Sequence, residues 1–164
     1  MKNKAVIIII LVANIIIQST LISRLPVFGV RGNLSIAVIV ALSIGFGSYT
    51  GGYSGLFIGL IEDILFSPVI GTRALIYFII GFLIGNTEAG INKEDVRSGI
   101  IFTMAATAFY YFVHFLLMRA IGEAFNMTQY LMGPLFIEIL INLMLYIICF
   151  KLFNRIFDYP RFRL

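Results

Sequence analysis

The sequence contains no tryptophan, one cysteine and one histidine, and only 12% of its 164 residues are charged. The single cysteine, Cys149, cannot form an internal disulfide, and within an apolar run it says nothing about redox compartment. No Cys/His metal spacing, phosphate-binding loop or nucleophile elbow is present. The longest polar stretches are about ten residues, far too short for a separate soluble domain. These absences exclude a nucleotide-binding or soluble catalytic module, and no cofactor is expected.

Apolar residues dominate the chain instead. Hydrophobic side chains account for 60% of the residues, and the mean hydropathy is +1.02. Such a composition is typical of a protein dissolved in a lipid bilayer, where only helices and closed barrels satisfy every backbone group. The Ile, Leu, Val and Phe runs show no alternation of apolar and polar residues, so the sequence predicts helices. The expected fold class is therefore an all-α, multi-pass membrane protein.

Six membrane spans are expected in a single membrane domain, residues 1–164. The polar residues 87–97 form a loop, and residues 45–52 are so rich in glycine and turn formers that they predict a tight reversal between two short spans. If the reversal fails, the count is five. The first span is expected to be uncleaved, because no small-residue cleavage site follows it cleanly. The predicted spans are residues 5–23, 34–48, 52–67, 73–86, 98–118 and 131–151.

The distribution of Lys and Arg predicts the orientation. Eight of these residues lie on one side of the six-span topology and four on the other, which places both termini in the cytoplasm. The net charge of +4 reflects a basic tail in which arginines alternate with aromatic residues. This pattern favours an anchor at anionic headgroups over a nucleic-acid site. The proposed anchor residues are Lys151, Arg155, Arg161 and Arg163.

Glycines recur every four residues in the middle of the chain. Gly47, Gly51, Gly55 and Gly59 keep this spacing, and Asp63 continues it. In the third span, Gly55, Gly59, Glu62 and Asp63 would share one helix face, where glycine lets another backbone approach closely. Two interpretations stay open: ordinary packing within the chain, or a surface for a partner helix.

Ionisable side chains within the spans predict a polar cluster. A charge at the bilayer centre costs roughly 2.5 to 3.5 kcal/mol on insertion scales, so such residues usually face protein or water. The six-span topology places them together in the outer half, where an ion pair between Asp63 and Arg73 is favoured. Protonation of some carboxyls is the alternative. His114 is expected to be a packing residue rather than a proton relay. The cluster comprises Glu62, Asp63, Arg73, His114, Glu138 and Asn142, and its role is either structural pairing or a partner or ligand site.

The order of these features resembles a known family. Asn33 and Leu34 precede a long apolar run, Gly55 and Gly59 lead to Asp63, and then follow Gly71, Tyr77, Gly81 and Gly85. Across residues 33–85 this pattern is similar to the rod shape-determining protein MreD family, whose length and short basic tail also match.

The resemblance implies a non-enzymatic inner-membrane subunit of the bacterial elongation machinery, needed for cell shape and for peptidoglycan synthesis along the side wall. The implied partners are MreC, the MreB filament, and the peptidoglycan polymerase and transpeptidase. MreC would dock on the glycine face and the outer cluster around Asp63, while residues 87–97 and the basic tail would face the filament.

A second interpretation is transport. The compact six-span bundle resembles the substrate-binding subunits of energy-coupling factor vitamin transporters, which would give Glu62, Asp63, Glu138 and Asn142 a place in a vitamin pocket. Those subunits often carry an Ala-x-x-x-Ala docking surface on the first helix. Here Ala5 and Ala13 are eight residues apart, so that surface is missing. An enzyme acting on lipid carriers is a third option, but it would need a nucleophile or metal set that we do not find.

Overall fold

Helices make up nearly all of the chain that the computed structural model describes, residues 2–87, 95–122 and 134–157. Apart from one isolated bridge between Val27 and Val30, no strand occurs in these ranges. The all-helical prediction is therefore confirmed. The elements are α1 (Lys2–Thr20), the short 3-10 helix η1 (Ile22–Arg24), α2 (Leu34–Phe66), α3 (Thr72–Asn86), α4 (Val96–Ala120) and α6 (Pro134–Ile156).

Four of the described helices are long and apolar enough to cross a membrane: the first, α2, α4 and α6. Helix α3, with 15 residues, is apolar but shorter. These helices confirm the membrane character expected from composition. The count of six crossings stays a prediction.

Helix α2 bends back on itself at Gly47. This residue has φ 83° and ψ −177°, a backbone conformation outside the helical region that glycine adopts without a Cβ penalty. The Ser35 hydroxyl donates a hydrogen bond to Glu62, 27 residues later. In a straight helix these residues would be about 40 Å apart. Helix α2 is therefore a hairpin of two helical halves, and its bend lies within residues 45–52, where the sequence predicts a reversal.

The second half of α2 packs against α3 through glycine. A Cβ placed on Gly55 would lie 2.6 Å from the Tyr77 carbonyl carbon, and one on Gly59 would lie 2.6 Å from the Ala74 nitrogen. A Cβ on Gly51 would likewise lie 2.7 Å from the Gly81 oxygen. Real Cβ atoms do not approach other atoms this closely, so the two backbones touch only because side chains are absent. The regular glycine spacing serves packing within the chain.

The first half of α2 forms the core. Ile36, Ile39, Val40 and Leu42 have no exposed surface. This half is buried on every face, as expected for a helix enclosed by others. By contrast, α1 is mostly exposed, with apolar side chains such as Ile8 and Ile9 directed outward. Exposed apolar surface of this kind suits contact with lipid.

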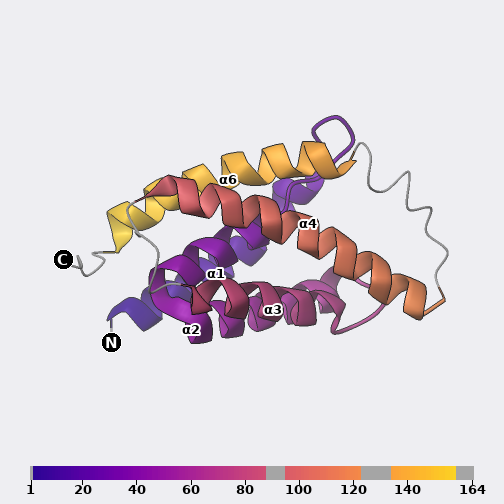
Figure 1. Ribbon diagram of the computed structural model, residues 1–164, viewed down its shortest axis with the longest axis horizontal. Helices are drawn as coiled ribbons and strands as arrows, with labels where there is room; N and C mark the ends of the chain where they lie inside the picture. Colours follow the sequence, from indigo (N-terminus) through magenta and orange to yellow (C-terminus); the bar gives the residue numbers. More distant parts are fainter. Residues whose placement is uncertain (1, 88–94, 123–133, 158–164) are drawn as a thin grey trace.

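The bundle has two distinct ends. Figure 1 shows the start of α1 and the end of α6 at the same end, on the left of the view. The bend of α2 belongs there too, because the Phe46 ring contacts the Phe157 ring with centroids 4.8 Å apart. We call this the hairpin end. The opposite end, defined by Gln18, Asn33, Glu62, Arg73 and Glu138, is called the polar end.

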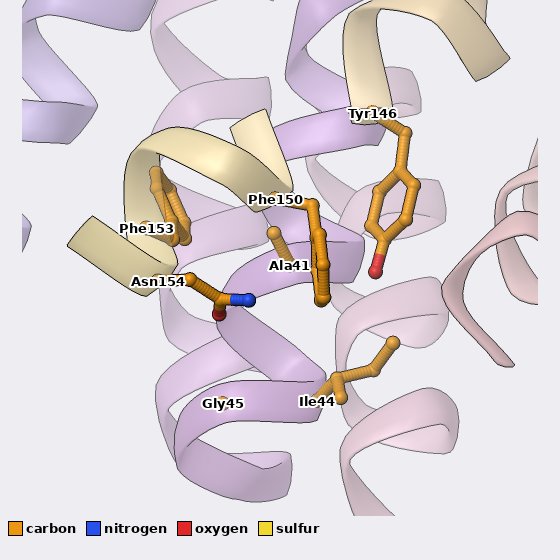
Figure 2. A pocket seen from close by; sticks show the side chains of 7 residues that line it. All are labelled: Ala41, Ile44, Gly45, Tyr146, Phe150, Phe153 and Asn154. Carbon is orange, nitrogen blue, oxygen red and sulfur yellow. The ribbon is translucent and has the colours of Figure 1, made fainter. Parts of the chain in front are cut away.

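A small depression lies between α2 and α6 near the hairpin end (Figure 2). It is lined by Ala41, Ile44, Gly45, Tyr146, Phe150, Phe153 and Asn154. Its volume is about 10 Å³. A cavity needs roughly 10 to 15 Å³ to hold one water molecule, so this depression is a packing gap and not a ligand site.

Candidate functional site: a polar network at one end of the bundle

Asp63 caps the beginning of α3 from the neighbouring helix. Its carboxylate, with no exposed surface, accepts hydrogen bonds from the backbone N–H groups of Gly71 at 2.9 Å, Arg73 at 3.0 Å and Ala74 at 3.2 Å. The Thr72 hydroxyl donates a longer bond at 3.4 Å. These are the first N–H groups of a helix, which lack partners within the helix and carry a partial positive charge. Asp63 satisfies them directly.

The prediction of an ion pair between Asp63 and Arg73 is wrong, because Arg73 pairs with a different carboxylate. The Arg73 guanidinium pairs with Glu62, with Nη1 to Oε2 at 3.4 Å, whereas Asp63 binds only the backbone N–H of Arg73. The reason is the position of the α3 start. The α3 start brings several backbone N–H donors to the Asp63 carboxylate, while the Arg73 guanidinium lies within reach of Glu62.

Glu62 lies at the centre of a second set of hydrogen bonds. It is 1% exposed and accepts from the Ser35 hydroxyl, from the Tyr77 hydroxyl at 3.1 Å and from Arg73. Asn14 of α1 donates to the Ser35 hydroxyl at 2.8 Å. A buried charge is tolerated when it is paired and hydrogen-bonded, so this carboxylate joins α1, both halves of α2 and α3.

Two further contacts extend the network to α4 and α6. Asn142 accepts from the backbone N–H of Asn33 at 2.7 Å and donates to the Thr107 hydroxyl at 3.1 Å. Asn33 also donates to the Tyr77 hydroxyl at 2.7 Å. Asn142 and Thr107 have no exposed surface. The network therefore connects all the long helices through buried polar side chains, which fixes their relative positions.

The remaining predicted residues have separate positions. Glu138 accepts from the Tyr111 hydroxyl. His114 is partly buried and its ring stacks on Tyr110, with centroids 5.5 Å apart, in a packing arrangement. Gly55 and Gly59 contact α3 and not the cluster. Within the described residues, no three His, Cys, Asp or Glu side chains gather as a metal site.

The basic tail is only partly described. Lys151 and Arg155 are exposed on the last turns of α6, at the hairpin end. Arg161 and Arg163 lie outside the described residues. The interfacial anchor therefore stays a prediction.

Several members of the network were not predicted from the sequence, notably Asn14, Gln18, Ser35 and Tyr111. Gln18 donates to the Gly32 carbonyl at 3.2 Å and accepts from the Leu34 N–H at 2.9 Å. Asn14 and Gln18 are four residues apart in an otherwise apolar span, so they share a helix face. Polar residues within a span usually face protein, and this signal could have identified them.

A cavity of about 250 Å³ opens among these side chains at the polar end. Every described helix contributes to its wall. The lining residues are Gln18, Ser23, Arg31, Gly32, Asn33, Glu62, Phe66, Arg73, Tyr110, Tyr111 and Glu138.

Comparison with known proteins identifies the family. The family model described as rod shape-determining protein MreD matches residues 1–156, nearly the whole chain. No curated protein and no solved structure matches. The family consists of shape-determining structural membrane proteins, in agreement with the apolar helices and with the pattern of residues 33–85. The chain therefore belongs to the MreD family of rod shape-determining membrane proteins.

Proposed function

We propose that this protein is a non-enzymatic scaffold subunit of the bacterial elongation complex, which binds MreC in the inner membrane and supports side-wall peptidoglycan synthesis. The family match over residues 1–156 carries the proposal. The polar network supports it, because it holds helices from the whole chain in fixed positions and so presents a defined surface to a partner. MreB and the peptidoglycan polymerase and transpeptidase would belong to the wider complex.

The proposed topology has six crossings with both termini in the cytoplasm. The bend at Gly47, the bias of basic residues and the common end shared by the α1 start and the α6 end support it (Figure 1). Helix α3, with 15 residues, is about 22 Å long and shorter than the roughly 30 Å hydrocarbon core. Local thinning of the bilayer accommodates such a mismatch at modest cost.

Cysteine labelling tests this topology. In a Cys149→Ala background, Arg31→Cys is expected to react with a membrane-impermeant maleimide from the outside and Arg97→Cys only from the inside. Both positions are exposed and at opposite ends of the bundle. Labelling of intact cells and of inverted vesicles provides the measurement. Reaction of both cysteines from the same side would rule out the proposed orientation.

We place the proposed MreC docking surface away from the glycine face. The α3 backbone already covers Gly55 and Gly59, so these residues support the docking surface from within and do not receive a partner helix. The polar end also carries an exposed apolar loop. Phe28 at its tip is 88% exposed, and Val27 and Val30 close the loop with two backbone hydrogen bonds. We assign the juxtamembrane part of MreC to this end.

Copurification with MreC tests the docking surface. Phe28→Asn is expected to reduce the MreC recovered with the tagged chain about tenfold, because a buried aromatic anchor at an interface contributes about 1.4 kcal/mol or more. Phe28 has φ 51°, which asparagine tolerates, so the substitution keeps the fold. Tyr49→Asn, an exposed aromatic near the bend of α2, is the matched control and should leave recovery unchanged. If the tagged wild-type chain recovers MreC in no greater amount than it recovers an unrelated bitopic protein, the scaffold proposal fails.

Transport is the second candidate function and would use the cavity at the polar end, but this cavity is small for a vitamin. Its volume of about 250 Å³ is below the 300 to 1,000 Å³ typical of pockets for drug-sized ligands. A vitamin that copurifies with the chain in place of MreC would support transport.

A further inference from the structure

The cavity at the polar end is built like a binding site for a small polar group. It lies where all the described helices converge, a common place for ligands in helical bundles. Its volume of about 250 Å³ equals that of roughly eight liquid water molecules. An occupant of this size is a headgroup and not a large cofactor.

The cavity wall contains equal numbers of basic and acidic side chains, but not all of them pair with one another. Arg31 and Arg73 are the basic side chains of the wall, and Glu62 and Glu138 are the acidic ones. Only Arg73 and Glu62 form an ion pair among the described residues. Glu62 is occupied further by Ser35 and Tyr77. One side chain of each kind, Arg31 and Glu138, therefore forms no ion pair within the described part of the chain.

Arg73 also has a hydrogen-bond donor that no described residue accepts. Its Nη1 donates to Glu62, but its buried Nε has no hydrogen-bond partner among the described residues. A guanidinium has five N–H donors arranged to bind phosphate or carboxylate oxygens. Because Nε is buried, the donors available to an anion are the other guanidinium N–H groups of Arg73 and those of Arg31, both in the cavity wall, while Glu138 offers acceptor oxygens to a cation.

We propose that this cavity binds a zwitterion consisting of a phosphate or carboxylate next to a primary ammonium, with the anion on Arg31 and Arg73 and the ammonium on Glu138. A ligand of zero net charge leaves the balance of the wall unchanged while it satisfies both unpaired charges.

The ethanolamine headgroup of a phospholipid has this chemistry and is the favoured source. Phe66 lines the cavity and is about half exposed, so it offers an apolar rim for the acyl chains. Choline headgroups have no N–H to donate to Glu138, and glycerol headgroups have no cation. Free phosphoethanolamine shares the recognised groups but would gain nothing from the apolar rim.

Native mass spectrometry of the full chain tests the proposal. Delipidated protein in detergent is mixed with equal amounts of phosphatidylethanolamine, phosphatidylcholine and phosphatidylglycerol. We expect the ethanolamine lipid to be retained about tenfold more than either competitor, as one charge-assisted contact predicts. Soluble O-phosphoethanolamine is added in a second arm. Displacement of the lipid would assign the site to any such zwitterion, and resistance would assign it to the phospholipid.

Substitutions in the cavity wall test which side chains cause the preference for the ethanolamine lipid. Glu138→Gln keeps the side-chain size and removes the charge, so the preference over phosphatidylcholine should fall to within about twofold. Arg31→Gln, in an exposed loop where the fold does not depend on it, should lower retention of all phosphate lipids. Arg24→Gln, an exposed arginine outside the cavity wall, is the control. Equal retention of the three lipids by wild-type protein, or an unchanged preference in Glu138→Gln, would overturn the proposal.

Discussion

Gly59→Leu is expected to abolish the folded state. A Cβ at this position would lie 2.5 Å from the Ala74 Cα and 2.6 Å from its nitrogen, and these are backbone atoms that cannot move aside alone. The second half of α2 would have to separate from α3, which would also remove Asp63 from the α3 N-terminus. Even Gly59→Ala should lower the free energy of unfolding by about 3 kcal/mol, at the upper end of overpacking effects.

Gly52→Ala is the matched control for this prediction. A Cβ there would lie 3.3 Å from the Phe78 ring, a side chain that can shift by a few tenths of an ångström. Alanine also favours a helix over glycine by up to about 1 kcal/mol, so Gly52→Ala should be nearly neutral. Unfolding in mixed micelles titrated with SDS measures both variants. Equal stability of the two alanine variants would refute the close contact of α2 and α3.

Asp63→Ala is the second substitution with a large expected effect. It leaves the N–H groups of Gly71, Arg73 and Ala74 without the acceptor that the buried Asp63 carboxylate provides. An N-cap alone contributes about 1 kcal/mol, and each buried unsatisfied donor adds about 1 to 3 kcal/mol. Water can reach some of the freed groups, so the loss should be smaller than the sum of these contributions. We therefore expect the free energy of unfolding to fall by about 3 to 4 kcal/mol.

Asp63→Asn shows how much of the stabilisation comes from the hydrogen-bond acceptor of Asp63 and how much from its charge. Asparagine keeps one acceptor oxygen but loses the charge that interacts with the α3 dipole, so it should cost about half as much as alanine. The same SDS titration provides the measurement. Ser67→Ala, at the end of α2 where the side chain is partly exposed, is a nearby control and should change stability by less than about 0.5 kcal/mol. An Asp63→Ala variant as stable as this control would contradict the capping role.

Several features could be predicted from residue types and spacing. The apolar runs without alternation indicate membrane helices, and residues 45–52 contain the glycine at which α2 bends. The four-residue spacing puts Gly55, Gly59 and Asp63 on one helix face, and in the structure this face meets α3. The pattern of residues 33–85 resembled the MreD family, and the match over residues 1–156 confirms it.

Other features depend on the packing of helices that are distant in sequence. Spacing defines a face but not the neighbour that covers it, so the glycine face was also compatible with a partner helix. The Ser35 and Glu62 contact exists because the α2 hairpin brings together residues 27 apart. The cavity has the same origin, because its wall takes side chains from every described helix.

The sequence by itself determined that this protein is an all-helical membrane protein, because composition and local periodicity are properties of each segment alone, while the residue pattern of 33–85 gave the resemblance to the MreD family. Only the tertiary structure decided which donor each buried carboxylate meets. Asp63 binds the backbone N–H groups at the start of α3, and Glu62 takes the guanidinium of Arg73. The physical reason is that a buried charge is satisfied by whichever donors the packed helices bring within reach, and sequence distance does not set that reach.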